Sequence, residues 1–531
     1  MNILFAMQSP EYLRFYDLTI RALAARGHRI VIAINKQNDA KPVRLEGMDA
    51  GEAVAVLGVL PRRTDIWRGV SRRLRGLVDF VRYLHPRFAQ APALRARIRN
   101  KVLPPGFRVL DRLPSLSAGL TNGILGVLHA CERAIPSSAV IEDVITREHA
   151  DLVLVSPLVD AASDQVDLVK SAHALGVPVG ACIASWDNLT NKGQMRVTPD
   201  AVFVWNDAQK REAVEYHDIP ADRVVTTGAQ VFDRWFDRVP GDRATFCARV
   251  GLLPDRPFLL YTCSSSFIAI SHAELEFVRT WIAAVRGVPE LRDLGILIRP
   301  HPYNITAWET ADLSEWPNVA VWPRGAYNPM EEEGRSAFFD SLFHGVAVVG
   351  INTSAMIEAA IIGRPVLSLV ADGFTGTQEG TLHFHYLLPE NGGFLRMAHS
   401  LPEHVDQLRD VLADPETVRR QTERFVASFV RPHGVDRPCT PILADGIERL
   451  GASGRLRPER TPSWAPLLWP CLLAANAYSY CCAVATDRKV ASKLVKQVRG
   501  RLREASRTVK RSPDKLRRRV KRVFRAVEGH R

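Results

Sequence analysis

One stretch of the chain, residues 349–370, predicts a strand, a sharp turn, a short helix and a second strand. Its two ends are apolar, as expected of buried strands. Gly363 should end the helix, and Pro365 prevents its continuation. A strand, a helix and a second strand in immediate succession form the unit of a parallel sheet whose faces are covered by helices. The unit therefore predicts an α/β fold.

The start of this predicted helix has the chemistry of a phosphate site. Thr353 and Ser354 lie where the helix should begin, and a helix start offers unpaired N–H groups and a partial positive charge. Glu358 follows Ser354 by four residues and lies on the same face. It would accept hydrogen bonds from ribose hydroxyls, or else belong to a solvated helix face. We therefore expect a nucleotide at this turn.

Alternating strands and helices occur in two series along the chain. The first series starts with a strand at residues 2–7, a helix at 12–26 and a strand at 30–34. The second series starts at Pro257, after a linker at 239–242. Two such series predict two Rossmann-like parallel-sheet domains facing each other across a cleft. Their expected ranges are 1–240 and 241–450, with an arginine-rich helical insertion in the first at about 61–120.

The positive charge of the chain is concentrated in two segments. The protein carries a net charge of +13, yet residues 486–531 alone contribute +14 and residues 61–112 contribute +11. The remainder is therefore acidic. Two basic segments on an acidic body favour a patch for an anionic membrane surface over a nucleic-acid site.

Several common sites are absent from the sequence. None of the eight cysteines forms a Cys-x-x-Cys pair, and scattered thiols suit a reducing compartment. No P-loop motif occurs, and the first strand–helix loop lacks Gly-x-Gly-x-x-Gly. No Asp-x-Asp occurs either, so a metal–diphosphate clamp of that kind has no carrier. We expect no metal and no cofactor other than a nucleotide-activated substrate.

Two further loops in the second half are candidates for donor binding. In Arg299-Pro-His-Pro302, which follows a predicted strand, His301 could donate to a phosphate and Arg299 could make a bidentate contact. Ser264, Ser265 and Ser266 follow the first strand of this half, where hydroxyl and backbone donors often hold phosphate. Simple turns are the alternative for both loops.

The first half offers candidates for the acceptor side and for catalysis. The loop 184–193 follows a buried strand and contains Trp186, Asp187, Asn188 and Lys192. Polar loops at such positions carry ligand contacts more often than core residues do. Glu11, in the first strand–helix loop, and Asp187 are the candidate catalytic carboxylates.

Together these motifs resemble a known family. The two Rossmann-like halves, Ser185-Trp-Asp-Asn-Leu-Thr-Asn-Lys-Gly193, Arg299-Pro-His-Pro302 and the 349–370 unit resemble GT-B glycosyltransferases of bacterial surface polysaccharides, over roughly residues 1–450. The His-Pro pair with Thr353-Ser354 is similar to bacterial sialyl- and Kdo-transferases and to teichoic-acid glycerophosphate polymerases.

The resemblance implies that His301 contacts donor phosphate and that Thr353 and Ser354 hold phosphate or ribose. It also implies that no metal is needed. The sequence departs from those families in lacking their Asp/Glu-Asp/Glu-Gly motif.

The C-terminal part, residues 463–531, predicts membrane association. Residues 464–485 carry no charge but include two prolines, Asn476 and two tyrosines, which suit an interfacial segment better than a span. Apolar residues then recur at helical spacing among Lys and Arg, as in basic amphipathic helices. We expect a peripheral protein on the cytoplasmic face of the cell membrane.

The resulting hypothesis is an inverting, metal-independent glycosyltransferase. It would move a sugar from a nucleotide to a lipid-linked glycan or cell-surface polysaccharide, with the acceptor on domain 1–240 and the donor on domain 241–450. The alternatives are a glycerophosphotransferase, an isomerase of the UDP-N-acetylglucosamine 2-epimerase kind, and a non-catalytic membrane-bound scaffold.

Overall fold

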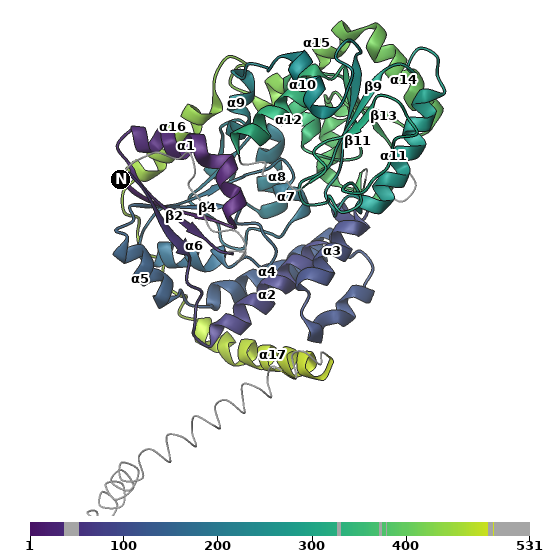
Figure 1. Ribbon diagram of the computed structural model, residues 1–531. Coiled ribbons are helices and arrows are strands. Elements are labelled where there is room, and N and C mark those ends of the chain that lie inside the picture. Colours follow the sequence, from purple (N-terminus) through teal and green to yellow (C-terminus); the bar gives the residue numbers. More distant parts are fainter. Residues whose placement is uncertain (37–52, 326–330, 371–373, 379, 487–491, 493–531) are drawn as a thin grey trace, which may run out of the picture.

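The computed structural model describes residues 1–36, 53–325, 331–370, 374–378, 380–486 and 492. It contains two separate parallel sheets, one in each half of the chain (Figure 1). The predicted pair of Rossmann-like domains is therefore confirmed. The predicted basic amphipathic helices beyond residue 486 lie outside the described residues, except for residue 492.

The N-terminal sheet has seven strands in the order β3-β2-β1-β4-β5-β6-β7, and every pairing is parallel. Its chain order reverses between β1 and β4, which makes this the topological switch point. The half-exposed edge strand β3 was not predicted. The strands are β1 (Asn2–Met7), β2 (Arg29–Ile34), β3 (Val54–Val59), β4 (Leu152–Ser156), β5 (Val179–Cys182), β6 (Ala201–Val204) and β7 (Val224–Thr226).

The C-terminal sheet has six parallel strands in the order β10-β9-β8-β11-β12-β13. Its switch point lies between β8 and β11. The predicted 349–370 unit is present as β11, α13 and β12, and Gly363 ends the helix with a positive φ of 76°. The strands are β8 (Phe258–Thr262), β9 (Gly295–Arg299), β10 (Val319–Val321), β11 (Ala347–Gly350), β12 (Val366–Leu369) and β13 (Arg396–Ala398).

Helices cover both sheets because their apolar faces pack on the strands. In the N-terminal half these are α1 (Leu13–Ala25), α5 (Ala139–Arg147), α6 (Gln165–Ala174), α7 (Asn188–Asn191), α8 (Asp207–His217) and α9 (Asp233–Phe236). In the C-terminal half they are α10 (Arg243–Val250), α11 (Ser271–Arg286), α12 (Glu332–His344), α13 (Ala355–Ile361), α14 (Leu401–Ala413) and α15 (Pro415–Phe425), which continues into a π-helical turn, Val426–Val430.

The basic insertion is helical, and it extends beyond the predicted end at residue 120. It comprises α2 (Trp67–Arg82), α3 (Pro92–Val102), the 3-10 segment η4 (Pro105–Arg112) and α4 (Ala118–Ala134). The helix α3 also contacts the C-terminal half at η7 (Thr375–Thr377).

Part of the insertion's positive charge is buried. The net charge of residues 61–112 therefore overstates the positive charge on the surface of the insertion. Arg63, Arg75 and Arg82 are buried. Arg75 binds Asp167 at 2.7 Å and Glu132 at 2.8 Å, because a buried guanidinium requires compensating charge. These arginines hold the insertion against the N-terminal sheet.

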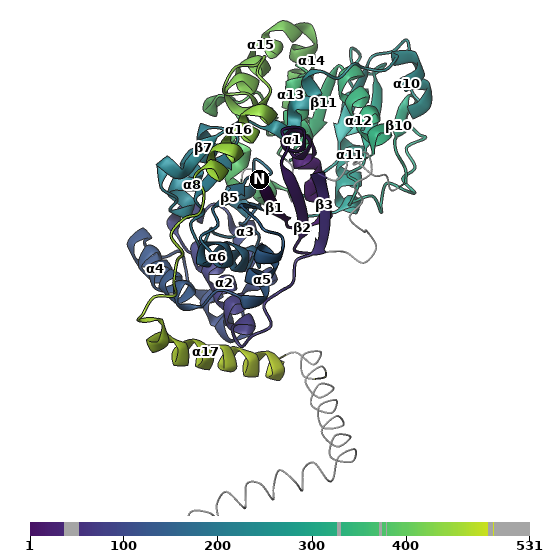
Figure 2. The same cartoon turned by 90° about the vertical axis from the view of Figure 1, so that its left-hand side faces the viewer.

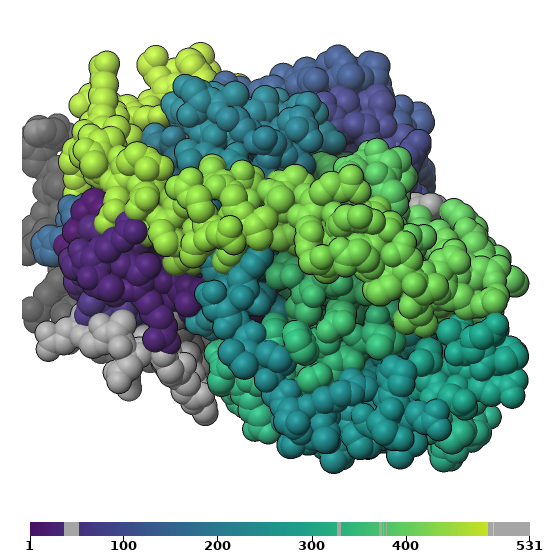
Figure 3. All heavy atoms as spheres, turned by 90° about the horizontal axis from the view of Figure 1, so that it is seen from above, coloured from purple at the N-terminus to yellow at the C-terminus, as the bar shows by residue number. Residues whose placement is uncertain are grey.

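The chain returns to the N-terminal half after the second domain. Helix α16 (Cys439–Ala452) packs on α1, where Arg26 binds Asp445 and Glu448, and Figure 3 shows this C-terminal segment lying across both halves. Helix α17 (Ala465–Thr486) then lies along the insertion at the foot of the molecule (Figures 1 and 2).

Candidate functional site

A cavity of about 400 Å³ lies between the two halves, at the carboxyl ends of strands from both sheets. Its walls carry six arginines and three carboxylates, so its charged side chains sum to a positive charge. Such a composition suits an anionic ligand. The charged residues are Arg14, Arg97, Arg234, Arg238, Arg299, Arg335, Asp17, Asp187 and Glu358.

The C-terminal wall is built at the switch point between β8 and β11. Ser265 follows β8, and Thr353 and Ser354 follow β11; all three line the cavity. The two strands approach closely here. A Cβ added to Gly350 would lie only 2.9 Å from the carbonyl oxygen of Thr262, so this position has no room for a side chain. The Ser354 side chain makes no capping bond to its own helix.

His301 lines the same wall and is poised as a neutral donor. Burial lowers the pKa of His301 to about 4, and nearby Arg14 acts in the same direction. The backbone N–H of Tyr303 donates to its Nδ1 at 3.2 Å. The ring proton must then lie on Nε2, since an accepting ring nitrogen carries no hydrogen. His301 can thus donate one hydrogen bond at neutral pH.

Arg299 is held rigidly beside this loop. Its Nη1 donates to Ser341 Oγ at 2.8 Å and to the carbonyl of Ala337 at 3.3 Å. Its guanidinium also lies 5.0 Å from the ring centres of both Trp322 and Phe338. Restraint of this kind pre-orients the charge toward the cavity.

Glu358 is half-buried on the cavity wall, one turn into α13. Burial raises the pKa of Glu358 to about 8, and Arg14 and Arg299 only partly oppose this effect. Its carboxyl group is therefore largely neutral at pH 7, so it can donate as well as accept a hydrogen bond.

The N-terminal wall comes from the 184–193 loop and contacts the C-terminal half directly. Trp186 Nε1 donates to Ser354 Oγ at 3.2 Å, and its ring packs edge-on against His383 at 4.6 Å. His383 lies in the 3-10 segment η8 (Leu382–Leu387) and lines the cavity. Trp186 therefore joins the two domains across the cleft.

Asp187 lies beside Trp186 and is held as a carboxylate. Burial alone would raise the pKa of Asp187, but His383, Lys192 and hydrogen bonds from Ser185 and Asn191 bring it below its usual value. Asn191 Nδ2 donates to Asp187 Oδ2 at 2.7 Å. The side chain is thus ionised and oriented, as a base must be.

Arg82 of the insertion braces this loop from behind. Its guanidinium donates to the carbonyl oxygens of Leu189, Lys192 and Gly193 at 2.6 to 3.0 Å. Because three carbonyls converge on one buried cation, the loop has little freedom to change shape.

Several predicted site residues do not line the cavity. Asn188 is buried and turned into its own loop, where its Oδ1 accepts from the Ala184 N–H. Ser264 is buried, with its N–H bound to Glu274, and Ser266 lines a different hollow. Glu11 lies outside the cavity, and Lys192 Nζ donates to Tyr12 Oη at 3.0 Å.

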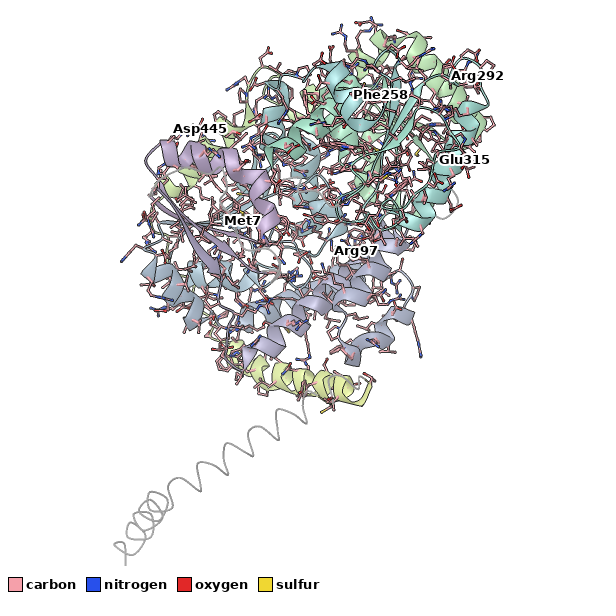
Figure 4. The ribbon with its side chains drawn as sticks, in the orientation of Figure 1. Met7, Arg97, Phe258, Arg292, Glu315 and Asp445 are labelled. Atoms are coloured by element: carbon pink, nitrogen blue, oxygen red, sulfur yellow. The ribbon has the colours of Figure 1, made fainter. Side chains whose placement is uncertain are left out.

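Sequence reasoning missed Arg14 and Arg97 as lining residues. Arg97 lies on α3 of the insertion where it meets the C-terminal half, and its guanidinium stacks 4.2 Å from the Phe267 ring centre (Figure 4). Alternating arginines and aromatic residues in the insertion were visible in the sequence. Their pattern did not reveal which arginine would reach across the cleft.

A second charged cluster lies at the switch point of the N-terminal sheet. Asp160, which follows β4, accepts from Gln8 Nε2 at 2.8 Å, Lys36 Nζ at 3.2 Å and Lys101 Nζ at 3.4 Å. Lys192 also lowers the pKa of Asp160, to about 2. Three ammonium groups thus surround one carboxylate, which leaves an excess of positive charge.

No protein-family model matches the chain, and a search of curated proteins found no match. Solved structures similar to it include UDP-GlcNAc 2-epimerase from Neisseria meningitidis bound to UDP-GlcNAc (TM-score 0.46, 13% identity, 84% of this chain and 100% of that one). A glycosyltransferase from Rickettsia africae gives a TM-score of 0.47 at 9% identity (85% and 98%).

WaaG, a glycosyltransferase involved in lipopolysaccharide biosynthesis, gives a TM-score of 0.41 at 12% identity (84% and 99%). Epimerases and glycosyltransferases occur together among these structures, so the comparison does not choose between the two activities.

The fold follows from the topology itself. Both sheets have Rossmann-like strand orders, their carboxyl edges meet at one cavity, and α16 returns to the first domain. The chain has the GT-B fold, as the sequence predicted.

Proposed function

We propose that this protein is a glycosyltransferase that uses a nucleotide-activated sugar. The observation that carries the proposal is the interdomain cavity, whose arginines meet His301, Thr353 and Ser354 at the C-terminal switch point. A nucleoside mono- or diphosphate matches this combination of positive charge, hydroxyls and a neutral imidazole donor.

In this proposal His301 Nε2–H and Arg299 hold the donor phosphate, and Thr353, Ser354 and Ser265 bind phosphate or ribose. The protonated Glu358 carboxyl would bond a ribose hydroxyl or a phosphate oxygen. The arginines would stabilise the leaving nucleotide, so the reaction would need no metal or other cofactor.

Asp187 is the proposed base in an inverting transfer. It would take the proton of the acceptor hydroxyl while that oxygen attacks the anomeric carbon. The bond from this carbon to the phosphate oxygen would break at the same time, and the nucleotide would leave with the electron pair. Because one displacement occurs, the anomeric configuration would invert.

The acceptor is proposed to be a lipid-linked glycan with an anionic group. The cluster of Lys36, Lys101 and Lys192 around Asp160 supports this class, since its excess positive charge lies beside the loop that carries Asp187. We place the protein on the cytoplasmic face of the membrane, where nucleotide-activated donors occur.

Nucleotide binding is tested by thermal shift with CMP, CDP, UDP and GDP on wild type, His301→Ala and His272→Ala. His272 is an exposed histidine of α11 outside the cavity and serves as the control. We expect one nucleotide to stabilise wild type and His272→Ala, and His301→Ala to bind it about 10- to 100-fold more weakly. Absence of stabilisation by all four nucleotides would refute the proposal.

The reaction type is tested by incubating the protein with nucleotide sugars, with and without a membrane extract. Acceptor-dependent release of nucleotide supports transfer. Epimerisation of the sugar in the absence of any acceptor would show an isomerase instead.

A further inference from the structure

Helix α17 is packed lengthwise against the insertion. Near its start, Trp469 Nε1 donates to the carbonyl of Ala134 at 2.9 Å, and its ring meets Trp67 at 5.4 Å. About two turns later, Asn476 Oδ1 accepts from Arg73 at 2.5 Å, and two residues further on Tyr478 packs on Phe107 at 6.5 Å. The helix is therefore attached to the protein along most of its length.

This attachment is incompatible with an upright span. Among the described residues, α17 is long and apolar enough to cross a membrane, and α4 with α5 forms a second, bent candidate. If α17 stood upright in a bilayer, the insertion beside it would have to enter the hydrocarbon with arginines such as Arg68, Arg72 and Arg73. Placing these charges there would be costly. Helix α17 must therefore lie in the plane of any membrane it meets.

The face that α17 turns away from the protein is apolar. Leu467 is 79% exposed, Tyr478 is still 57% exposed beside its contact with Phe107, and no charged residue occurs in the helix. Two of the elements that contact α17, η4 and α4, also expose large apolar side chains, with Val109 at 62%, Leu120 at 55% and Val127 at 64%. We use the name apolar seat for five of these side chains, Val109, Leu120, Val127, Leu467 and Tyr478.

Such exposure is concentrated in this part of the molecule. Eight of the sixteen large exposed apolar side chains on the described residues lie in 66–127 or 464–478. An apolar surface of this kind marks a contact with a lipid or a protein.

Exposed arginines border the seat. Arg68 precedes Gly69, where an added Cβ would lie 2.9 Å from Asn476 Oδ1. Arg72 precedes Arg73, which donates to Asn476, and Arg108 follows Phe107, which packs on Tyr478. All three are exposed and make no ion pair with any described residue. An apolar surface bordered by unpaired arginines matches a bilayer with anionic headgroups better than the apolar surface of a second protein copy.

We propose that the apolar seat enters the outer part of an anionic bilayer, with the axis of α17 in the membrane plane. The seat side chains would lie among the upper acyl chains, and Arg68, Arg72 and Arg108 would bind lipid phosphates. This inference rests on the membrane location in the proposed function and identifies the surface responsible for it.

The test is flotation of the full chain with vesicles of phosphatidylcholine alone and with phosphatidylglycerol added. The variant combines Val127→Glu and Leu467→Glu, and the matched control is Leu253→Glu, since Leu253 is 53% exposed but lies between α10 and β8. We expect the double variant to bind the anionic vesicles about tenfold more weakly, because two charges enter the apolar contact. The control should bind like wild type.

Circular dichroism and the nucleotide thermal shift confirm that each variant is folded. If the double variant loses vesicle binding but keeps the nucleotide thermal shift, the loss concerns the membrane surface and not nucleotide binding. Wild-type flotation by the double variant would overturn the inference. The inference would also be overturned if wild type is a dimer and the double variant is a monomer that still binds vesicles. The seat would then be a contact between two copies of the protein.

Discussion

At the scale of single residues, Glu358 has the most informative environment. Its carboxyl lies on a cavity wall with Arg14 and Arg299 nearby, yet burial still raises its pKa to about 8. A carboxyl that stays neutral beside arginines is suited to donate to a ligand oxygen. This role was not evident from its helical spacing, which indicated only the side of α13 on which it lies.

Replacement of Glu358 by Gln should change how stability depends on pH. The carboxyl ionises near pH 4.3 in an unfolded chain but only at about pH 8 in the folded protein. The folded state binds more protons between these values, so this group lowers stability as pH rises through the interval. Gln has no such proton. We therefore compare the melting temperature of Glu358→Gln minus that of wild type. This difference should increase by roughly 2–4 °C between pH 5 and about pH 8 and then level off.

Differential scanning fluorimetry at several pH values measures this difference. Glu390, an exposed carboxylate of the 3-10 segment η9 (Pro389–Asn391), provides the control as Glu390→Gln. A difference between Glu358→Gln and wild type that does not vary with pH would show that Glu358 is ionised throughout.

At the scale of elements, α3 serves both sides of the cleft. Arg97 lines the cavity, and Lys101, one turn later, binds Asp160 at the N-terminal switch point. One helix of the insertion thereby reaches both the proposed donor site and the proposed acceptor site.

Lys101→Gln should raise the KM for an anionic acceptor about tenfold while leaving the nucleotide thermal shift unchanged, because one ammonium group is lost from the acceptor side alone. Steady-state kinetics with the membrane acceptor measures this effect. Arg99→Gln on the same helix is the control, since Arg99 is exposed and binds Asp111 at 2.9 Å. Equal KM values for Lys101→Gln and wild type would remove the lysine cluster from acceptor binding.

The elements of the two sheets were largely predictable from sequence. Buried parallel strands are continuous apolar runs, and β1 and β2 were recognised within one residue of their ends. The edge strand β3 was missed because edge residues are half-exposed and lack such a run. The helices α12 and α16 were not predicted either.

The candidate site was predictable only in part. Thr353, Ser354, His301 and Trp186 follow strands directly, and the carboxyl ends of parallel strands meet. The direction of a loop side chain is set by tertiary contacts. Asn188 turns inward to the Ala184 N–H, and Arg97 lies 170 residues before its partner Phe267 in the sequence.

At the scale of the whole molecule, hydrogen bonds, ion pairs and a shared apolar cluster join the two halves. Trp186 is central to them through Ser354 and His383, and Tyr386 Oη adds a bond to Glu212 at 2.7 Å. Loss of one of these contacts would favour rotation of one domain away from the other.

Trp186→Phe keeps an aromatic ring but removes the hydrogen bond to Ser354. We expect the open form to become more populated and the nucleotide to bind about 3- to 10-fold more weakly, as one interdomain hydrogen bond is lost. Isothermal titration measures the affinity, and small-angle scattering should show a larger radius of gyration without nucleotide. Trp316→Phe, in the C-terminal domain and outside the cavity, is the control. Unchanged affinity in Trp186→Phe would show that this contact does not limit closure.

The lengthwise packing of α17 on the insertion also has a kinetic consequence. The same insertion holds Arg97 at the cleft, so a bilayer in contact with α17 would fix the angle at which the cleft faces the lipid surface. The acceptor would then arrive by lateral diffusion in two dimensions. Turnover would follow the mole fraction of acceptor in the membrane, and diluting the vesicles in buffer would leave it unchanged.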